Sequence, residues 1–569
     1  MNNDFFKKNR ISVDYILWMI LLLSLFFRLW GINWGLPYLY QSEEYKIVNY
    51  TLKMLGNKTL NPHFFEYPSL YYYFMAVVYG IYFIVGFVLG VYKSASEFAV
   101  LFVKNPTGIY VVSRVIESLF GVGVVYLTFL TGKKVFNRRV GYLLAFFVAI
   151  TPNLIDNCHK IKGDMAMLFL SLLFFYFLIQ YYYEEKERYL LISGVVLGLS
   201  VSTKYLAIGM SVLIPVVCYF VDRRRNKFFL RNRNFYFAIL LSITFFFLGS
   251  PFILISYKEF LETFKNIFVP RTDASKNIGL GFLYVLKHFL YIGDINENYF
   301  WLGLVGYLGF FNALYKIIFQ KKEKYVLMIL PVITYFFIVG RHIFPGKGFL
   351  FNAFPFFLMT GADFVDNFFY NKVLRWPVFV LLVLSIGSSL WVSFNVSYAF
   401  TLPDPRTEAK NWIEKNIPSG TAILIDMPVK SPQLVMEYSQ LEQLYKKAIE
   451  LNNYKKEYLY LKLQAFKDYY PTYFIYQVKR HILEVGAPPN LVEKAQEVQA
   501  LLDVSQWDNL YKYNIQYIIV NDLDASISSF NSPTLAKFYS EVPNRCKLLK
   551  RFLRKNFYHQ VPEVYVYSM

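Results

Sequence analysis

Two adjacent carboxylates, Glu43 and Glu44, directly follow the first long apolar run of the chain. Further acids stand at Glu66 and Asp164, near other apolar runs. Basic groups lie close to these acids in the sequence or in a later polar stretch: Arg28, His159, Lys160, Lys162, Arg341, His342 and Lys347. A carboxylate can remove a proton from a hydroxyl group, and cations can stabilise a phosphate leaving group. The residue types therefore favour acid–base chemistry on a phosphate-linked substrate.

Each of these residues also has a structural interpretation. Glu44 could begin a surface helix, since acids favour helix N-termini, and Asp164 could be an N-cap. His159 is better explained as a polar loop residue than as a ligand. Arg28 and Lys204 could extend along an apolar surface to reach water, and for Lys204 this interpretation is preferred.

The composition indicates a membrane protein. Of the 569 residues, 56% are hydrophobic and only 17% are charged, whereas soluble proteins have nearer a quarter charged. Uncharged runs such as 165–183 and 235–257 are long enough to cross a bilayer, which takes roughly 20 apolar residues. The net charge of +20 lies largely in short loops, so it indicates topology and anionic lipid headgroups rather than nucleic acid.

The basic loops fix a predicted topology, because Lys and Arg mark the cytoplasmic side. With these loops inside, the N-terminus is cytoplasmic and everything after about residue 397 is extracytoplasmic. We expect a polytopic helical protein of the cytoplasmic membrane with about 11 to 13 transmembrane helices. Eleven spans are predicted near 13–34, 109–132, 140–157, 164–183, 189–203, 205–221, 235–256, 299–318, 325–340, 349–366 and 376–396.

The segment 68–92 has the length of a span but conflicts with this topology. If it crossed the membrane alone, the basic loops after it would change sides. The following stretch, 93–103, contains Lys93 and Glu97 and is a poor return span. We therefore predict that 68–92 lies in the outer leaflet or re-enters the membrane.

Two domains are expected. Residues 1–400 form the transmembrane domain, with outer loops at 35–108, 157–164, 257–298 and 341–348. Residues 401–569 form a soluble extracytoplasmic α/β domain. This region combines amphipathic helical patterns at 404–420 and 434–463 with strand-like runs at 421–426 and 515–520.

No cofactor is predicted with certainty. Cys158, Cys218 and Cys546 are too scattered for a disulfide framework or a cysteine metal site. Outer carboxylates, Glu43 and Asp164 among them, have the oxygen ligands that a divalent cation prefers. The basic side chains could equally neutralise a phosphate without a metal ion.

Several motifs together resemble one enzyme family. "RLWGINWGLPYLYQSEEYKIV" is similar to the first-loop signature of the protein O-mannosyltransferase-like glycosyltransferases, which include the lipid A aminoarabinose transferases. "NPHFFEYPSLYYYFMAV", with Glu66 and Tyr67, resembles the family's next outer stretch. The block "SRVIESLFG…KIKGDMAMLFLSLL", "GLSVSTKY" and "DPRTEAKNWIEKNIPSGTAILID" follow in the family's order.

The resemblance implies a GT-C fold and an inverting transfer of a sugar from a polyprenyl-phosphate donor to an acceptor on the outer face. The acceptor would be a glycan, a lipid or a protein, and glycosylation of the cell envelope is the implied setting. It implies that Glu43 is the base, in the position of the family's first-loop Asp, and that Glu44 and Asp164 are further catalytic acids. Gln41 and Ser42 stand where the family often has His-Pro, and Lys347 is only loosely matched to a family Arg.

Other functions compete with this interpretation. A transporter for a lipid-linked sugar should have polar groups in mid-membrane, mirrored between two halves, but these groups gather in the outer loops. A structural or scaffold protein would leave the acids and bases of those loops unexplained. A catalytically inactive homologue stays an alternative, because Glu43 stands where the family has Asp. A membrane glycosyltransferase is the preferred interpretation.

Overall fold

The computed structural model describes residues 14–268, 278–341, 347–426, 428–479, 489–523, 532–558 and 561–569. The chain divides into two compact units. The helical unit contains residues 1–32, 53–75 and 113–398. The sheet unit contains 33–52, 76–112 and 399–569, so two stretches of the predicted outer loop group with the C-terminal region.

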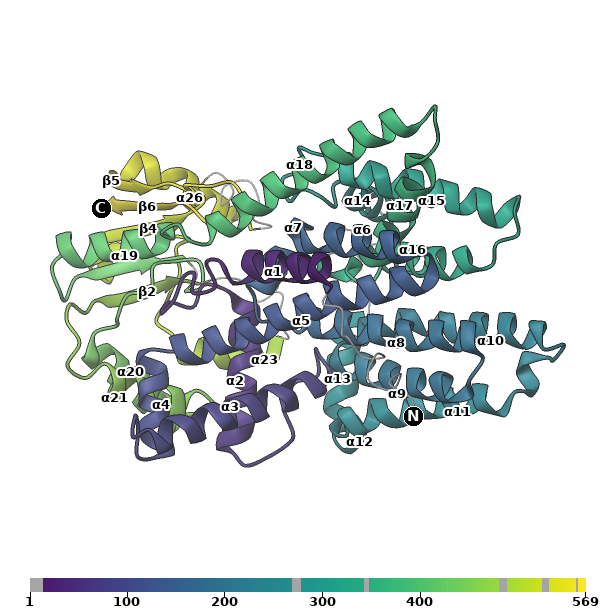
Figure 1. Ribbon diagram of the computed structural model, residues 1–569. Coiled ribbons are helices and arrows are strands. Elements are labelled where there is room, and N and C mark those ends of the chain that lie inside the picture. Colours follow the sequence, from purple (N-terminus) through teal and green to yellow (C-terminus); the bar gives the residue numbers. More distant parts are fainter. Residues whose placement is uncertain are drawn as a thin grey trace, which may run out of the picture. The chain divides into compact units, whose positions relative to one another are not determined.

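The helical unit is built from apolar helices (Figure 1). Its elements are α1 (Tyr15–Leu29), α6 (Arg138–Ala149), α7 (Pro152–Cys158), α8 (Asp164–Glu184), α9 (Glu187–Thr203), η1 (Tyr205–Val212), α10 (Leu213–Arg224), η2 (Phe229–Arg231), α11 (Arg233–Gly249), α12 (Phe252–Ile255), α13 (Tyr257–Phe268), α14 (Ile278–Leu290), α15 (Trp301–Ile318), α16 (Lys324–Gly340), η4 (Lys347–Leu350), α17 (Phe354–Phe369) and α18 (Arg375–Ala399). Three more helices are divided between the two units: α2 (Ser42–Gly56), α3 (Leu70–Val88) and α5 (Thr107–Val135). The last residue of α18, Ala399, also belongs to the sheet unit.

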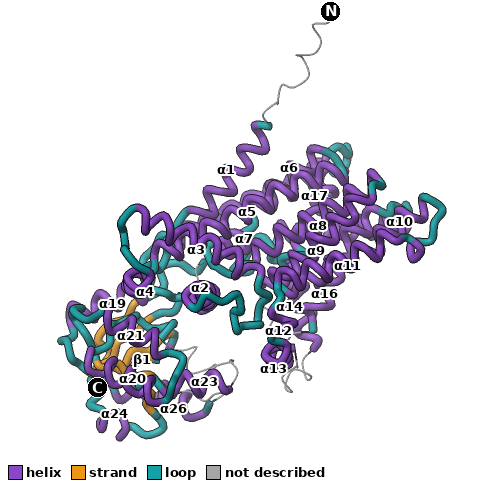
Figure 2. The backbone as a smooth tube through the Cα atoms, turned by 90° about the horizontal axis from the view of Figure 1, so that it is seen from below, coloured by secondary structure: helices purple, strands orange, loops and turns teal. Residues whose placement is uncertain are grey.

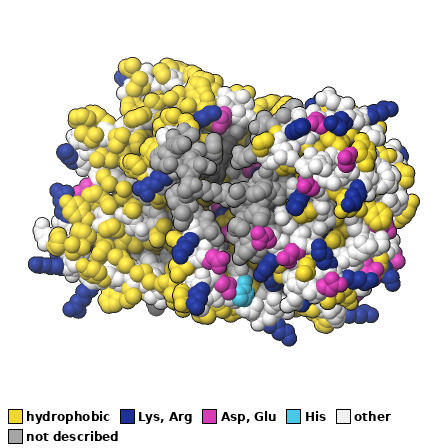
Figure 3. All heavy atoms as spheres, turned by 180° about the vertical axis from the view of Figure 1, so that it is seen from behind, with side chains coloured by type: hydrophobic (Ala, Val, Ile, Leu, Met, Phe, Trp, Pro, Cys, Tyr) yellow, Lys and Arg dark blue, Asp and Glu magenta, His cyan; other side chains and the backbone are white. Residues whose placement is uncertain are grey.

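Six helices among the described residues are long and apolar enough to cross a membrane. They are α3, α5, α8, the pair η1 and α10, α15 and α18. The bent pair α6 and α7 gives a seventh candidate if it is counted as one span. Four further helices are apolar but shorter: α1, α11, α14 and α16. Hydrophobic side chains cover most of the helical part of the face in Figure 3, as expected for a surface in contact with lipid.

The predicted span 140–157 is interrupted. Residues 140–157 were expected to form one helix, but α6 ends at Ala149 and α7 begins at Pro152, with a 57° bend between them. Proline lacks the N–H group that would continue the helix and disfavours helical backbone at the residue before it. The Thr151-Pro152 step therefore explains the bend.

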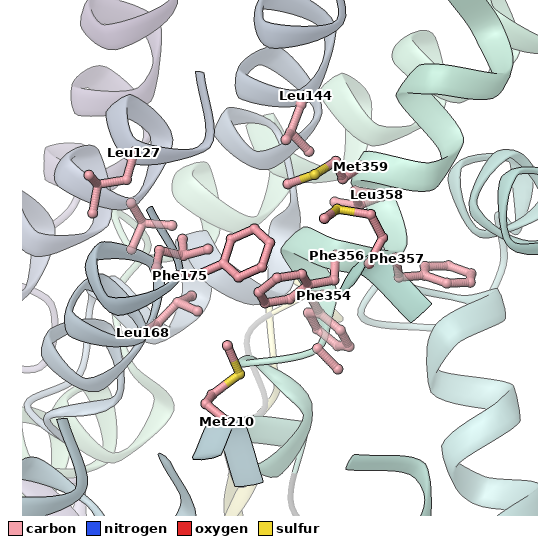
Figure 4. Close-up of a cluster of buried hydrophobic side chains, with 14 of the residues drawn as sticks. Leu127, Leu144, Leu168, Phe175, Met210, Phe354, Phe356, Phe357, Leu358 and Met359 are labelled. Atoms are coloured by element: carbon pink, nitrogen blue, oxygen red, sulfur yellow. The ribbon is translucent and has the colours of Figure 1, made fainter. Parts of the chain in front are cut away.

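The core of the helical unit is continuous and aromatic-rich (Figure 4). Leu127 of α5, Leu144 of α6 and Phe175 of α8 meet the start of α17 there. The rings of Phe175 and Phe356 contact edge to face, with centroids 4.7 Å apart. This packing holds α5, α6, α8 and α17 together in one core.

The sheet unit contains one six-stranded sheet, drawn in orange in Figure 2, with helices around it. Its strands are β1 (Ala422–Ile425), β2 (Phe474–Val478), β3 (Leu501–Leu502), β4 (Tyr517–Asn521), β5 (Lys547–Phe552) and β6 (Val564–Ser568). Its helices are α4 (Ala95–Lys104), α19 (Pro405–Asn416), α20 (Tyr438–Glu450), α21 (Lys456–Ala465), α23 (Pro489–Glu497), α24 (Asp508–Lys512) and α26 (Pro533–Arg545). The predicted strands at 421–426 and 515–520 correspond to β1 and β4.

The strand order is β3-β2-β1-β4-β6-β5. β1 pairs in parallel with β2 and β4, whereas β6 runs antiparallel to β4 and β5. Alternate residues of β1 enter two cores: Ile423 packs with Ile413 of α19, and Leu424 packs with Phe538 of α26. The sheet is thus covered on both faces, which is typical of a parallel α/β arrangement.

Candidate functional site

Asp164 and Lys204 form a buried ion pair in the helical unit. Asp164 is the first residue of α8, and Lys204 directly follows the end of α9. Lys204 Nζ lies 2.5 Å from Asp164 Oδ1, and the two side chains are 14% and 8% exposed. Asn157 donates a hydrogen bond of 3.2 Å to the other oxygen, Asp164 Oδ2. The pair therefore has the mutual attraction and the additional hydrogen bond that a buried ion pair needs.

This geometry corrects two expectations. Asp164 is not an N-cap, because Gly163 occupies that position and no side chain caps α8. Lys204 was expected to reach out to water, but its ammonium group is directed to Asp164. The two residues are 40 positions apart in the chain, so their spacing gave no sign of the contact.

Tyr67 and Glu117 extend the network around this pair. The ring of Tyr67 lies under the Lys204 ammonium, 4.7 Å from centroid to nitrogen. Glu117 of α5 accepts hydrogen bonds from the Gly163 amide, at 2.6 Å, and from the Tyr71 hydroxyl. Glu117 was missing from the sequence-based candidates, although a carboxylate inside an apolar span is itself a functional signal.

Arg28 and His159 bind main chain. Arg28 is fully buried, and it donates to the carbonyls of Ala149 at 3.1 Å and Val148 at 3.3 Å, which end α6. The last carbonyls of a helix lack the N–H groups of a following helical turn, and a cation suits a helix C-terminus. Arg28 therefore stabilises the α6–α7 break.

The His159 ring is equally buried, in the loop between α7 and α8. Its nitrogens lie 2.9 Å from Ile155 O and 3.0 Å from Trp30 O. Burial lowers the pKa of His159 to about 4, outweighing the opposite effect of the two carbonyls. The imidazole is then neutral at pH 7, and with a single N–H group it donates to only one of these two carbonyls.

The remaining candidates of the helical unit differ in their surroundings. Lys160 is paired with Asp156 at 2.6 Å, and Arg341 is exposed. Glu66 and Lys162 are half-buried, and no carboxylate of the described residues lies within ion-pair distance of Lys162. Lys347 begins η4, and a Cβ on the next residue, Gly348, would lie 3.3 Å from Asp164 Oδ2. His342 lies outside the described residues.

Glu43 and Glu44 belong to the sheet unit, in the first turn of α2. Glu44 is 1% exposed, so it is not a solvated loop residue. The Glu43 side chain is 28% exposed and lies 3.6 Å from Lys46. Glu43 therefore combines a helix N-terminal position with access to solvent.

The loop before α2 is held by the C-terminal region of the same unit. The Gln433 side chain donates to Leu39 O at 2.7 Å and accepts from Leu39 N at 3.2 Å. The Arg406 guanidinium lies over the Tyr40 ring, 3.8 Å from its centroid, and is paired with Asp404. The Tyr40 hydroxyl is 3.0 Å from Thr407 Oγ1.

The sequence left open whether Glu43 and Asp164 bind a divalent cation. The two residues belong to different compact units. Within the ranges that the structure describes, no group of three His, Cys, Asp or Glu side chains is arranged to hold a metal ion. A site that uses both carboxylates stays a prediction.

Comparisons with known proteins bear on this site. Residues 95–253, which contain Glu117, Asp164 and Lys204, match the family model of the dolichyl-phosphate-mannose-protein mannosyltransferases. No curated protein sequence matches the chain.

Solved structures resemble the whole chain. ArnT from Cupriavidus metallidurans in the apo state is 12% identical, with 96% of this chain and 97% of that chain covered and a TM-score of 0.51. The same protein bound to undecaprenyl phosphate is 13% identical over 97% and 96% of the two chains, with a TM-score of 0.48. The apo oligosaccharyltransferase of Archaeoglobus fulgidus is 12% identical over 90% and 70%, with a TM-score of 0.48.

The first of these structural likenesses extends over nearly all of both chains, and the family match contains the buried ion pair. The chain therefore has the fold of the GT-C membrane glycosyltransferases, and its residues 95–253 are similar to the dolichyl-phosphate-mannose-protein mannosyltransferase family.

Proposed function

We propose that the protein transfers a sugar from a polyprenyl-phosphate donor to an acceptor hydroxyl on the outer face of the membrane, with inversion at the anomeric carbon. The observation that carries this proposal is the buried Asp164–Lys204 pair within the segment that matches the family. The family's description names a dolichyl-phosphate-linked sugar, which supports a lipid-phosphate donor here.

In the proposed reaction the acceptor oxygen attacks the anomeric carbon in a single displacement. The bond between that carbon and the phosphate oxygen breaks, and the phosphate keeps the bonding electrons. Glu43 takes the hydroxyl proton as general base, and Glu44 supports it. A single displacement inverts the configuration of the anomeric carbon.

The basic groups stabilise the departing phosphate in this proposal. Asp164 offsets the charge of Lys204 and fixes the direction of its ammonium group. Lys162 has no carboxylate within ion-pair distance among the described residues, so its positive charge is uncompensated and suits a phosphate. Tyr67 covers Lys204 and restricts its movement. Arg28 and His159 support the surrounding main chain instead of binding the donor.

The test is donor turnover by the full-length protein in lipid. A panel of radiolabelled polyprenyl-phosphate sugars and a membrane extract as acceptor source would be incubated with wild type, Glu43→Gln and Glu457→Gln. Glu457 is an exposed acid of the same unit and serves as the matched control. We expect label in a new product with wild type and Glu457→Gln, and at least a hundredfold less with Glu43→Gln.

Two results would contradict the proposal. Full activity of Glu43→Gln would remove Glu43 from the mechanism. Donor binding without transfer by a folded wild-type protein, across the whole panel, would favour a lipid carrier over a transferase.

A further inference from the structure

Glu117 has an unusual place for a carboxylate. It lies on α5, a helix apolar enough to span the membrane, and its side chain is 0% exposed. A buried acid of this kind is costly unless it is hydrogen-bonded, and it is a functional candidate by default. Nothing in the proposed chemistry uses this residue directly.

One oxygen of Glu117 joins two segments that are far from it in sequence. Oε1 accepts from the Gly163 amide at 2.6 Å and from the Tyr71 hydroxyl, and each donor is 46 positions from Glu117. Gly163 and Tyr71 also touch each other. A Cβ on Gly163 would lie 3.1 Å from the Tyr71 ring, and the φ of Gly163 is +71°. Glycine is therefore required there for both space and backbone conformation.

Each of these two segments contains or adjoins a residue that contacts Lys204. Gly163 directly precedes Asp164, which is paired with Lys204. Tyr71 lies four residues after Tyr67, whose ring faces the Lys204 ammonium from another side. Glu117 thus connects the residue that pairs with Lys204 and the residue that covers it.

We propose that Glu117 is a positioning residue for sugar transfer, which holds Asp164 and Tyr67 in place around Lys204. The inference rests on the proposed function, because Lys204 is taken to act on the donor phosphate. Glu117 acts through the Gly163 amide and the Tyr71 hydroxyl and does not touch the reacting atoms.

A single side-chain oxygen carries this role. Oε1 of Glu117 accepts from two donors, the Gly163 amide and the Tyr71 hydroxyl. Glu117→Gln keeps the shape and a carbonyl acceptor, whereas Glu117→Ala removes both contacts. The glutamine variant should therefore retain more activity than the alanine variant.

The first measurement is hydrogen exchange of the full-length protein in lipid, which does not depend on catalysis. Glu117→Ala should speed exchange in the peptide containing Gly163 at least tenfold, and Glu117→Gln less. Thr128→Val is the matched control. Thr128 is another fully buried polar residue of α5, and its hydroxyl donates to Val125 O of its own helix and to no other segment that the structure describes. Unchanged exchange at Gly163 in Glu117→Ala would overturn the inference.

The second measurement is a double-mutant cycle with Asp164→Asn. We expect Glu117→Ala to lower kcat about tenfold to a hundredfold in the wild-type background, with Thr128→Val near wild type. In the Asp164→Asn background the same change should cost less than about twofold, because the two residues act as one unit. Equal losses in both backgrounds, or loss of melting temperature alone, would make Glu117 a purely structural residue. If the wild-type protein transferred no sugar, the proposed function would be contradicted. The hydrogen-exchange experiment would still show whether Glu117 holds the Gly163 segment in place.

Discussion

At the scale of single residues, charge compensation decides what the candidate site can do. Lys204 is held by Asp164 and Asn157 in a place that is nearly closed to water. A buried ion pair adds little net stability, but removal of one partner leaves an uncompensated charge. The pair is therefore sensitive to single substitutions and tolerant of a matched double substitution.

This argument gives a prediction for Lys204. Lys204→Met should destabilise the protein by about 3–5 kcal/mol and abolish transfer. The double variant Lys204→Met with Asp164→Asn should recover most of the stability and none of the activity, since no ammonium group is restored. Thermal unfolding in lipid and donor turnover measure the two effects. Activity in the stable double variant would show that Lys204 has no part in the reaction.

His159 gives a prediction on pH. The folded protein holds its pKa near 4 through burial, whereas an unfolded histidine has a pKa near 6.5. Between these values the unfolded chain binds more protons, so stability is complete above about pH 6.5 and falls as the pH decreases toward 4. The loss should be on the order of 2 kcal/mol by pH 4.5.

The measurement is the melting temperature between pH 7.5 and pH 4.5. His159→Asn should be less stable than wild type at pH 7.5 but should lose less on acidification. His63→Asn is the control, since the His63 side chain is 57% exposed. A wild-type acid slope retained in His159→Asn would assign the pH dependence to other groups.

At the scale of elements, the sequence predicted the helices and strands that depend on local patterns of residues. The hydrophobic runs located the helices, and α19 follows the helical pattern with Asp404 as N-cap and Pro405 in the first turn. The strands β1 and β4 were predicted from short β-branched runs. Contacts across the fold were not predictable in this way. The link from Arg28 to the α6 terminus spans 120 positions, and that from Gln433 to Leu39 spans 394.

The Gln433 contact leads to a prediction about the first loop. Gln433→Ala removes two hydrogen bonds to the main chain of Leu39, four residues before Glu43. With these bonds lost, the loop should hold Glu43 less firmly, and kcat should fall about tenfold with nearly unchanged melting temperature. Asn509→Ala, which loses one side-chain bond to Asp503 O elsewhere in the same unit, should transfer at the wild-type rate. If Gln433→Ala and Asn509→Ala transferred sugar at equal rates, the contact of Gln433 with Leu39 would have no part in catalysis.

At the scale of the whole molecule, the topology depends on α3. α3 and α5 run antiparallel: Tyr71 bonds to Glu117 near the start of α3, and a Cβ on Gly108 would overlap the Tyr82 hydroxyl further along α3. Between them α4 packs back on α3, with the Phe83 and Phe98 rings 5.4 Å apart. The ten residues of α4 are only about 15 Å long, and the hydrocarbon core is about 30 Å thick.

If α3 alone crossed the bilayer, α5 would start on the inside and Lys133 and Lys134, in its last turn, would be outside. Such a placement opposes the rule that basic loops are cytoplasmic. We therefore expect α3 and α4 to lie on the outer side, although α3 has the length and composition of a span. Composition alone could not distinguish these cases, because the decision comes from the short return helix and the charges after it.

The last prediction tests this placement. A cysteine at Lys93, in the exposed turn between α3 and α4, should react in intact cells with a maleimide that does not cross membranes. A cysteine at Arg231, in the basic loop before α11, should react only after the membrane is opened. The native cysteines are buried, so the unsubstituted chain supplies a low background. Reaction of the Lys93 site only from the cytoplasm would make α3 a true span, and it would then reverse the predicted side of every later loop.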